Sequence, residues 1–133
     1  MVGESLYFLV IKISTQKDYY KNMEIRENEK VCIFTPLSQT LNTYECSRLL
    51  KNIKKDSREI AIDLNYVEEC SIDFINTIKE ICATKKIGIF NIPSDIFTIF
   101  NIMQIDKCAS LYVSEIDFEA NKRQLINRQF TVF

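Results

Sequence analysis

The most reactive side chains of this sequence lie together in Cys70-Ser71-Ile72-Asp73, directly before an apolar stretch with helical spacing. A thiol or hydroxyl can act as a nucleophile when a base accompanies it. The chain of 133 residues has no histidine, so a Ser-His-Asp triad and histidine metal ligands are excluded. We therefore expect that Cys70 and Ser71 are not the catalytic nucleophiles of an enzyme. The pattern is typical of a helix start, with Ser71 as the N-cap and Asp73 as a first-turn carboxylate favoured by the helix dipole.

Cysteine and glycine usage excludes further chemistry. The number of cysteines is odd and no two have CxxC spacing, which argues against a disulfide framework and against a zinc or other metal site; they are Cys32, Cys46, Cys70, Cys82 and Cys108. We expect free, mostly buried thiols in a reducing cytoplasm, with Cys70 packed in the core. Only two glycines occur, so a glycine-rich phosphate loop is excluded and no cofactor is expected.

The charged residues indicate neither nucleic acid nor membrane as a partner. The chain has 17 basic and 18 acidic residues, a net charge of −1. A basic cluster contains Lys51, Lys54, Lys55 and Arg58. We interpret it as the solvated end of a helix, where positive charges interact favourably with the negative end of the helix dipole. Asp63 ends an apolar strand without a second acid at a suitable spacing, so its role is structural at the strand–loop junction.

No segment predicts a membrane span or a secretory signal. The longest apolar run, residues 6–11, is far shorter than the roughly 20 residues that a membrane helix needs, and Lys12 ends it. Glu4 precedes this run where a signal peptide would carry Lys or Arg. We therefore expect no direct membrane insertion and a cytoplasmic location.

Short apolar blocks alternate with amphipathic blocks along most of the chain. Asn42 and Glu45 have the spacing of a capping box, and Ser114 precedes the last helical block. The pattern predicts strands at 31–34, 60–64, 87–90 and 111–113, and helices at 43–55, at 72–84, from residue 94, and from residue 115 to about 127. This alternation predicts an α/β fold, a small sandwich with a mostly parallel sheet of four to five strands and about four helices.

The N-terminal region is interpreted separately. Residues 23–27 alternate and precede a turn at Asn28-Glu29, so they predict a hairpin partner for the strand at 31–34. Residues 1–22 are an extension that either adds an edge strand, from the partial alternation at 5–13, or is poorly ordered, with Met23 as the native start. The domain itself is expected to span 23–133.

A run of motif positions links the strand at 60–64 to the helix that follows it: Asp63-Leu64-Asn65, Val67, Cys70 and Ser71 to Ile75. This run resembles the STAS domain, the fold of bacterial anti-sigma factor antagonists and of sulfate-transporter tails. That family has an apolar strand ending Asp-Leu-Ser, a Val, two variable residues and an apolar residue, and then Asp-Ser-Ser/Thr-Gly-Leu opening a helix. Further similarity lies at Gln39-Thr40-Leu41-Asn42, 87–91, 93–95, 104–107, Ser114 and 118–120. The resemblance covers about residues 23–130 and implies the α/β sandwich described above.

The chain departs from this family where its signalling members carry phosphate. The family's acceptor serine is replaced by Ile72, its aspartate by Ser71, its second Ser/Thr by Asp73 and its glycine by Phe74. Three interpretations stay open: Ser71 is only an N-cap, Ser71 takes phosphate one residue early, or the site is constitutive. In the last case Asp73 supplies a fixed charge and Ile72 an apolar contact.

The resemblance implies a protein-interaction module rather than an enzyme. Its partner would be an anti-sigma factor or a Ser/Thr kinase, bound through the loop at 35–42 and the helix start after Ser71. The expected partner-binding residues are Gln39, Thr40, Leu41, Asn42, Ile72 and Phe74. The protein would be a monomer or weak homodimer that regulates transcription or signalling. The alternative is a STAS-like scaffold or small-ligand-binding subunit of a transporter or sensory complex, which an apolar pocket with convergent polar groups would favour.

Overall fold

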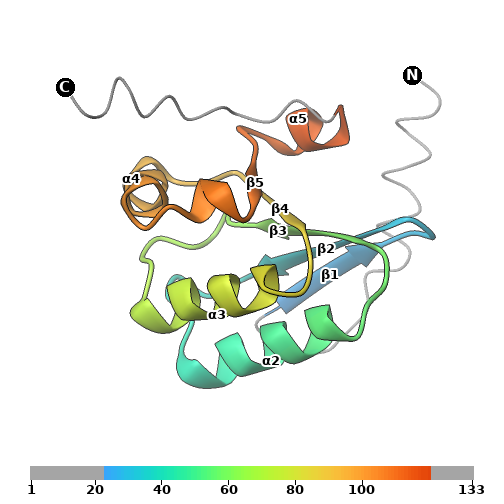
Figure 1. The fold of residues 1–133 in the computed structure, drawn as a ribbon, viewed down its shortest axis with the longest axis horizontal. Coiled ribbons are helices and arrows are strands. Elements are labelled where there is room, and N and C mark those ends of the chain that lie inside the picture. Colours follow the sequence, from blue (N-terminus) through green and yellow to red (C-terminus); the bar gives the residue numbers. More distant parts are fainter. Residues whose placement is uncertain (1–22, 121–133) are drawn as a thin grey trace.

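The computed structural model describes residues 23–120, in which strands and helices alternate (Figure 1). In chain order the elements are β1 (Met23–Glu27), β2 (Val31–Pro36), α2 (Thr43–Lys54), β3 (Glu59–Asp63), α3 (Ile72–Cys82), β4 (Ile87–Phe90), α4 (Ser94–Ile102), the 3-10 turn η1 (Ile105–Lys107), β5 (Ser110–Leu111) and α5 (Glu115–Glu119). The predicted strands lie within two residues of those observed. The interpretations placed on residues 1–22, and the predicted end of the last helix near residue 127, lie outside the described residues.

The five strands form one sheet in the order β1-β2-β3-β4-β5. β1 pairs with β2 in the antiparallel direction, and the pairings β2–β3, β3–β4 and β4–β5 are parallel. The sheet is therefore mixed, which corrects the expectation of a mostly parallel one. The expected α/β class is confirmed, with five strands and four α-helices within residues 23–120. The antiparallel pair β1–β2 is the predicted hairpin. In its turn, the Asn28 Oδ1 atom accepts hydrogen bonds from the amides of Lys30 and Val31 at 2.8 and 2.9 Å.

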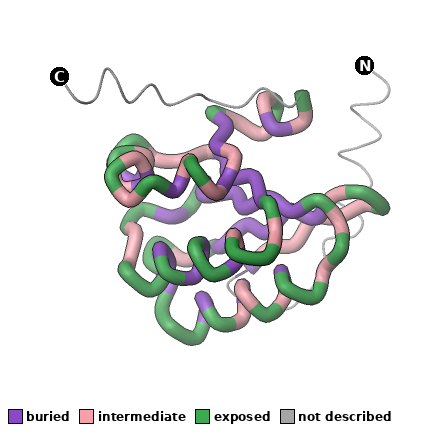
Figure 2. The backbone as a smooth tube through the Cα atoms, viewed as in Figure 1, coloured by how far each residue is buried: buried purple, intermediate pink, exposed green. Residues whose placement is uncertain are grey.

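Successive residues of each central strand enter two different apolar clusters. Cys32, Phe34, Ile60 and Ile62 join the main core, which also holds the buried stripes of α2, α3 and α4. The alternate residues Ile33, Ala61 and Phe90 face a smaller cluster with Tyr112 and Phe118 on the other side of the sheet. Because both faces are buried, these strands are apolar at nearly every position (Figure 2).

Helices α2 and α3 lie side by side and begin at the same end of the sheet (Figure 1). At the start of α2 the predicted capping box is confirmed: Asn42 Oδ1 accepts from the Glu45 amide at 2.8 Å, and Glu45 Oε1 accepts from the Asn42 amide at 2.9 Å. Parallel strands present their carboxyl ends at one edge of the sheet, so the loops that follow β2 and β3 meet there.

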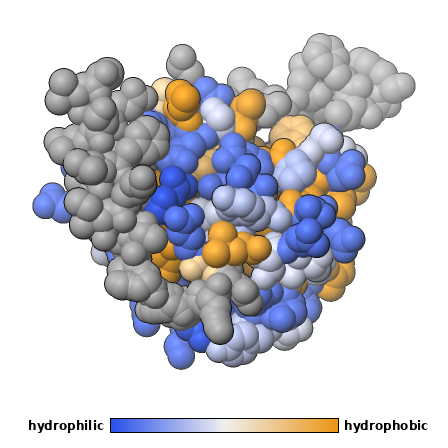
Figure 3. All heavy atoms as spheres, turned by 180° about the vertical axis from the view of Figure 1, so that it is seen from behind, coloured by the Kyte–Doolittle hydropathy of each residue, from blue (hydrophilic) through white to orange (hydrophobic). Residues whose placement is uncertain are grey.

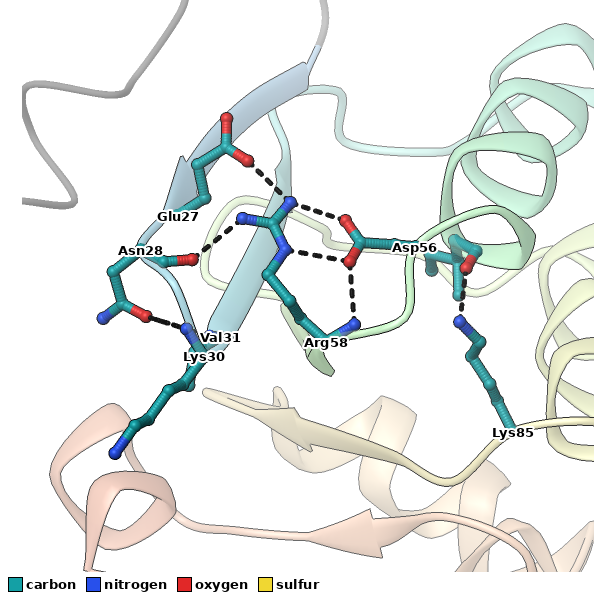
Figure 4. Close-up of polar contacts among 8 residues, drawn as sticks. Glu27, Asn28, Lys30, Val31, Asp56, Arg58 and Lys85 are labelled. Atoms are coloured by element: carbon teal, nitrogen blue, oxygen red, sulfur yellow. Dashed lines mark hydrogen bonds and ion pairs between the residues drawn. The ribbon is translucent and has the colours of Figure 1, made fainter.

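The opposite edge is held by an ion-pair cluster around Arg58 (Figure 4). Its guanidinium donates to Asp56 and Glu27, each at 2.7 Å, and to the Asn28 carbonyl at 2.9 Å. The hydrogen bonds between Arg58 and Asp56 lower the pKa of the Asp56 carboxyl. Arg58 is therefore part-buried and paired, which corrects the expectation that it belongs to a solvated helix end. Lys85 closes the same region by donating to the Ile53 carbonyl at 2.9 Å, near the end of α2.

Across residues 23–120, no helix has the length and apolar character that a membrane crossing requires.

Candidate functional site

The start of α3 is built around Ser71. Its Oγ atom accepts from the Phe74 amide at 3.1 Å, so the predicted N-cap is confirmed. The same hydroxyl donates to the carbonyl oxygen of Leu41 at 3.2 Å. Ser71 thus satisfies a free amide of α3 and also fixes this helix to the loop between β2 and α2.

Two of the predicted partner-binding side chains lie inside the domain. Phe74 is 0% exposed and packs in the main core, and Leu41 is also buried there. Neither side chain can contact a partner, so the prediction is wrong for these two residues. Ile72 is 66% exposed. The reason is helical phase: residues two apart point in nearly opposite directions, so burying Phe74 turns Ile72 outward.

The loops that follow β2 and β3 are joined directly. The Gln39 carbonyl accepts from the amides of Glu68 and Glu69 at 2.8 and 3.1 Å. Side chains repeat the connection, since Gln39 Nε2 donates to Glu68 at 3.3 Å and Thr40 donates to Glu69 at 3.2 Å. The structure therefore brings the predicted residues Gln39 and Thr40 next to the segment that leads into α3.

The two helix starts are joined in the same way. Thr43, the first residue of α2, donates to Asp73 in the first turn of α3 at 2.7 Å. Asn42 is the exposed N-cap immediately before Thr43. The predicted sequence segments 39–42 and 71–73 are thus one continuous surface, although about 30 residues separate them along the chain.

Sequence reasoning missed three exposed apolar side chains in this region. Leu37 lies in the first loop, Tyr66 in the second and Tyr44 in the first turn of α2, and all three are exposed, as is Ile72. We call Leu37, Tyr44, Tyr66 and Ile72, with the polar residues between them, the docking face. The sequence signal that could have identified Tyr44 and Tyr66 is a tyrosine in a predicted loop or at a predicted helix start, because tyrosine is enriched at protein interfaces.

The docking face holds four of the seven large apolar side chains that are exposed in the described part of the chain. The other three are Ile102, Val113 and Ile116. Viewed from behind, apolar side chains also line the edge of the molecule where the helices begin (Figure 3). Clustering of exposed apolar side chains, rather than their number, marks an interaction surface.

A polar network beneath the carboxyl ends of the strands centres on Asp63. Its Oδ1 atom accepts from the side-chain amide of Asn91 at 2.9 Å and from the Asn65 amide at 3.0 Å. Its Oδ2 atom accepts from Thr35 at 3.2 Å and from Arg26 at 3.3 Å. Asp63 thereby ties β1, β2, β3 and the residue after β4 together, which is the structural role expected at this strand end.

Arg26 connects the network to α5. Its Nη1 atom donates to both carboxylate oxygens of Glu115, at 3.0 and 3.1 Å, while its Nη2 atom donates to Asp63. Burial raises the pKa of Glu115, and the nearby Arg26 charge opposes this shift without cancelling it. Asp63 and Glu115 thus both accept from Arg26, an arrangement that suits a structural role.

Burial disfavours the thiolate form of three of the cysteines. Burial raises the pKa of Cys32 to about 12 and that of Cys70 to about 11, and it also raises the pKa of Cys46. A nucleophilic cysteine needs the opposite shift. Cys70 packs against the main core, as expected. In residues 23–120, no group of three or more potential ligands from His, Cys, Asp and Glu could hold a metal ion.

Two hollows lie at the other edge of the sheet, near the amino ends of the strands. One, of about 380 Å³, is bordered by Cys32, Phe34 and the Arg58 cluster. The second, of about 510 Å³, is bordered by Gly88, Tyr112 and other residues at the starts of β3, β4 and β5. Three polar side chains at the first hollow are engaged with one another, since Arg58 donates to Asp56 and Glu27.

Comparisons with known proteins identify the fold but no family. No protein-family model matches the chain, and no curated protein matches it. Seven chains of solved structures match. Among them, the chain is similar to the NMR structure of the protein TM1081, with a TM-score of 0.64 at 14% identity, over 82% of this chain and 95% of that chain. At this identity the likeness shows a shared α/β fold.

Proposed function

We propose that this chain is a STAS-like protein-interaction module of the anti-sigma factor antagonist kind, without enzymatic activity. It docks to an anti-sigma factor or a Ser/Thr kinase and so regulates transcription or signalling in a bacterial cytoplasm. The observation that carries this proposal is the docking face, where Ile72, the first residue of α3, is 66% exposed and directly precedes Asp73, which is bonded to the start of α2. The sequence resemblance and the α/β fold support the same assignment.

The docking face suits a protein partner for two reasons. Its backbone is fixed by hydrogen bonds between the loops, so little conformational entropy is lost when a partner binds. Its apolar side chains include two tyrosines, which bury a large area at low entropic cost and are frequent at binding hot spots. Affinity then comes from Ile72, Tyr44 and Tyr66.

Docking in this proposal does not depend on phosphate at the family's acceptor position, because Ile72 has no hydroxyl there. Ser71 is an unsuitable substitute. Its hydroxyl already accepts from the Phe74 amide and donates to Leu41. A phosphate on it would also lie near the Asp73 carboxylate, two residues away, and like charges repel. The module is therefore constitutive, with Asp73 as a fixed charge.

The test is affinity capture from the native host with the full chain as bait, followed by mass spectrometry. The variants are Ile72→Asp and, as the matched control, Ile116→Asp, which places the same charge at a similarly exposed isoleucine on α5. The proposal expects an anti-sigma factor or Ser/Thr kinase with the wild type and with Ile116→Asp, but not with Ile72→Asp. Peptides containing Ser71 are expected to be unmodified. Capture of the same partner by Ile72→Asp would overturn the proposal.

A second candidate is a scaffold or small-ligand-binding subunit of a transporter or sensory complex. The observation that favours it is the hollow of about 380 Å³, which combines apolar walls from Ile25 and Phe34 with polar groups such as Asn52 and Lys55. Capture of membrane-complex subunits in the same experiment would favour it. A rise in unfolding temperature with a small-molecule library, abolished by Asn52→Ala, would place the ligand in this hollow.

A further inference from the structure

Three exposed carboxylates on the docking face have, among the residues that the structure describes, only neutral hydrogen-bond donors as partners. Glu68 accepts from Gln39, Glu69 from Thr40, and Asp73 from Thr43. The ion pairs in the described part of the chain use Arg26, Lys54 and Arg58, and none of them involves these three carboxylates. The face therefore carries acidic charge that this chain's described cations leave uncompensated.

These carboxylates border the apolar side chains of the same face. Asp73 follows Ile72 directly, and Glu68 lies two residues after Tyr66. On the α2 side, Arg48 lies with its guanidinium carbon 5.4 Å from the centre of the Tyr44 ring and donates to the Tyr44 hydroxyl at 2.6 Å. This cation is thus held against the tyrosine, and the loop side of the face stays acidic.

On the basis of the proposed docking function, we infer that the docking face binds a protein segment in which Lys or Arg side chains surround an apolar anchor. An apolar centre with a charged border is the usual anatomy of a protein interface. Lys or Arg would replace the neutral donors on Glu68 and Glu69 with charge-assisted hydrogen bonds, which are roughly twice as strong. The same charges would steer the encounter and reject acidic partners such as nucleic acids or anionic membranes.

A selection with a random peptide library against the full chain tests this inference without knowledge of the natural partner. Peptides whose binding is lost with Ile72→Asp report on the docking face. Among these, the inference expects enrichment in Lys and Arg around an aliphatic or aromatic residue. It also expects Kd to rise by about tenfold or more between low and high salt, because complementary charges are screened.

Two variants distinguish the effect of the acidic charge on peptide affinity from any effect on the fold. Glu68→Gln combined with Glu69→Gln keeps oxygen acceptors for Gln39 and Thr40 while removing both charges, and the backbone bonds to the Gln39 carbonyl are unaffected. This pair of substitutions is expected to weaken the selected peptides about tenfold. Glu29→Gln, exposed at the β1–β2 turn, is the matched control and leaves the affinity unchanged.

The outcomes distinguish this inference from the function on which it rests. Peptides that need Ile72 but are neutral or acidic, or that tolerate Glu68→Gln with Glu69→Gln, would overturn the inference and leave docking intact. Peptides that bind equally to the wild type and to Ile72→Asp would overturn both, because no apolar docking face would then exist. Basic peptides that lose affinity with both sets of variants support the inference.

Discussion

Removing the charge of Asp63 tests how much the polar network contributes to stability. In Asp63→Asn the shape is kept and the remaining oxygen can still accept from Asn91 and Asn65. The new amide group, however, faces Arg26 and Thr35, which are both donors. Thr35 can rotate its hydroxyl to accept, but Arg26 cannot accept and loses this partner.

The expected cost follows from burial. The Asp63 and Arg26 side chains are only 8% and 15% exposed, so water compensates little for the lost charge-assisted hydrogen bond. Such bonds contribute about 1.5–3 kcal/mol, and removing one partner of a fully buried pair costs about 3–5 kcal/mol. Because Arg26 keeps its two bonds to Glu115, we expect Asp63→Asn to lower the free energy of unfolding by about 2–3 kcal/mol.

Urea unfolding of the full chain, followed by far-UV circular dichroism, measures this change. With an m value near 1.5 kcal/mol per molar urea, the midpoint should fall by roughly 1–2 M. The control is Glu80→Gln, which breaks the Lys54–Glu80 pair at 3.4 Å, where the side chains are 46% and 58% exposed. Exposed pairs contribute under about 1 kcal/mol. If Asp63→Asn costs no more than Glu80→Gln, the network does not stabilise the fold as argued.

Three further predictions concern packing, capping and pH. Gly88→Ala would place a Cβ atom 3.0 Å from a ring carbon of Tyr112, so we expect a loss of about 1–3 kcal/mol in urea unfolding, and no loss would show that the rings move freely. Ser71→Ala should cost about 1 kcal/mol through loss of the N-cap, whereas Ser71→Thr, which keeps a hydroxyl that can accept from Phe74 and donate to Leu41, should restore most of it; equal losses would argue against capping. Burial raises the pKa of Glu115 in the folded state, so folded protein binds this proton more tightly than unfolded protein. The contribution of Glu115 to stability therefore falls as pH rises from the ordinary carboxyl pKa to the raised one. In Glu115→Gln the unfolding temperature should change less with pH in this window than it does in the wild type. An unchanged pH dependence would contradict the argument.

Local patterns were sufficient to predict the elements of the fold. The capping box at Asn42 and the N-caps at Ser71 and Ser114 use side chains and amides within four residues of one another, so the sequence displays both partners. The hairpin between β1 and β2 was likewise predictable from alternation and a turn. Its antiparallel direction is also what makes the sheet mixed.

The candidate site was predictable only in part. The segments 39–42 and 71–73 were predicted to act together, and the contact from Thr43 to Asp73 joins them. Phe74 was assigned to the binding surface although its position in the helix also suits the buried face of α3, and one side chain cannot serve both. Its burial resolves the conflict in favour of the core.

The network around Asp63 could not be predicted from spacing. Arg26 and Glu115 are 89 residues apart, and Arg26 and Asp63 are 37 apart. The contacts between these residues depend on strand register and on where α5 packs against the sheet, and a local sequence pattern predicts neither. Asn91 adds a backbone signal, since its φ of 57° is a left-handed conformation that asparagine tolerates better than most residues.

The strand order β1-β2-β3-β4-β5 has a consequence for how the chain acquires its structure during synthesis. Each strand from β2 to β5 pairs with the strand translated immediately before it, so it finds a partner that has already been made. The sheet grows at a single edge, from the hairpin outward. All residues of the docking face, from Leu37 to Asp73, are translated before β4 begins at Ile87. The surface proposed to meet a partner is therefore among the first parts of the domain that the growing chain can assemble.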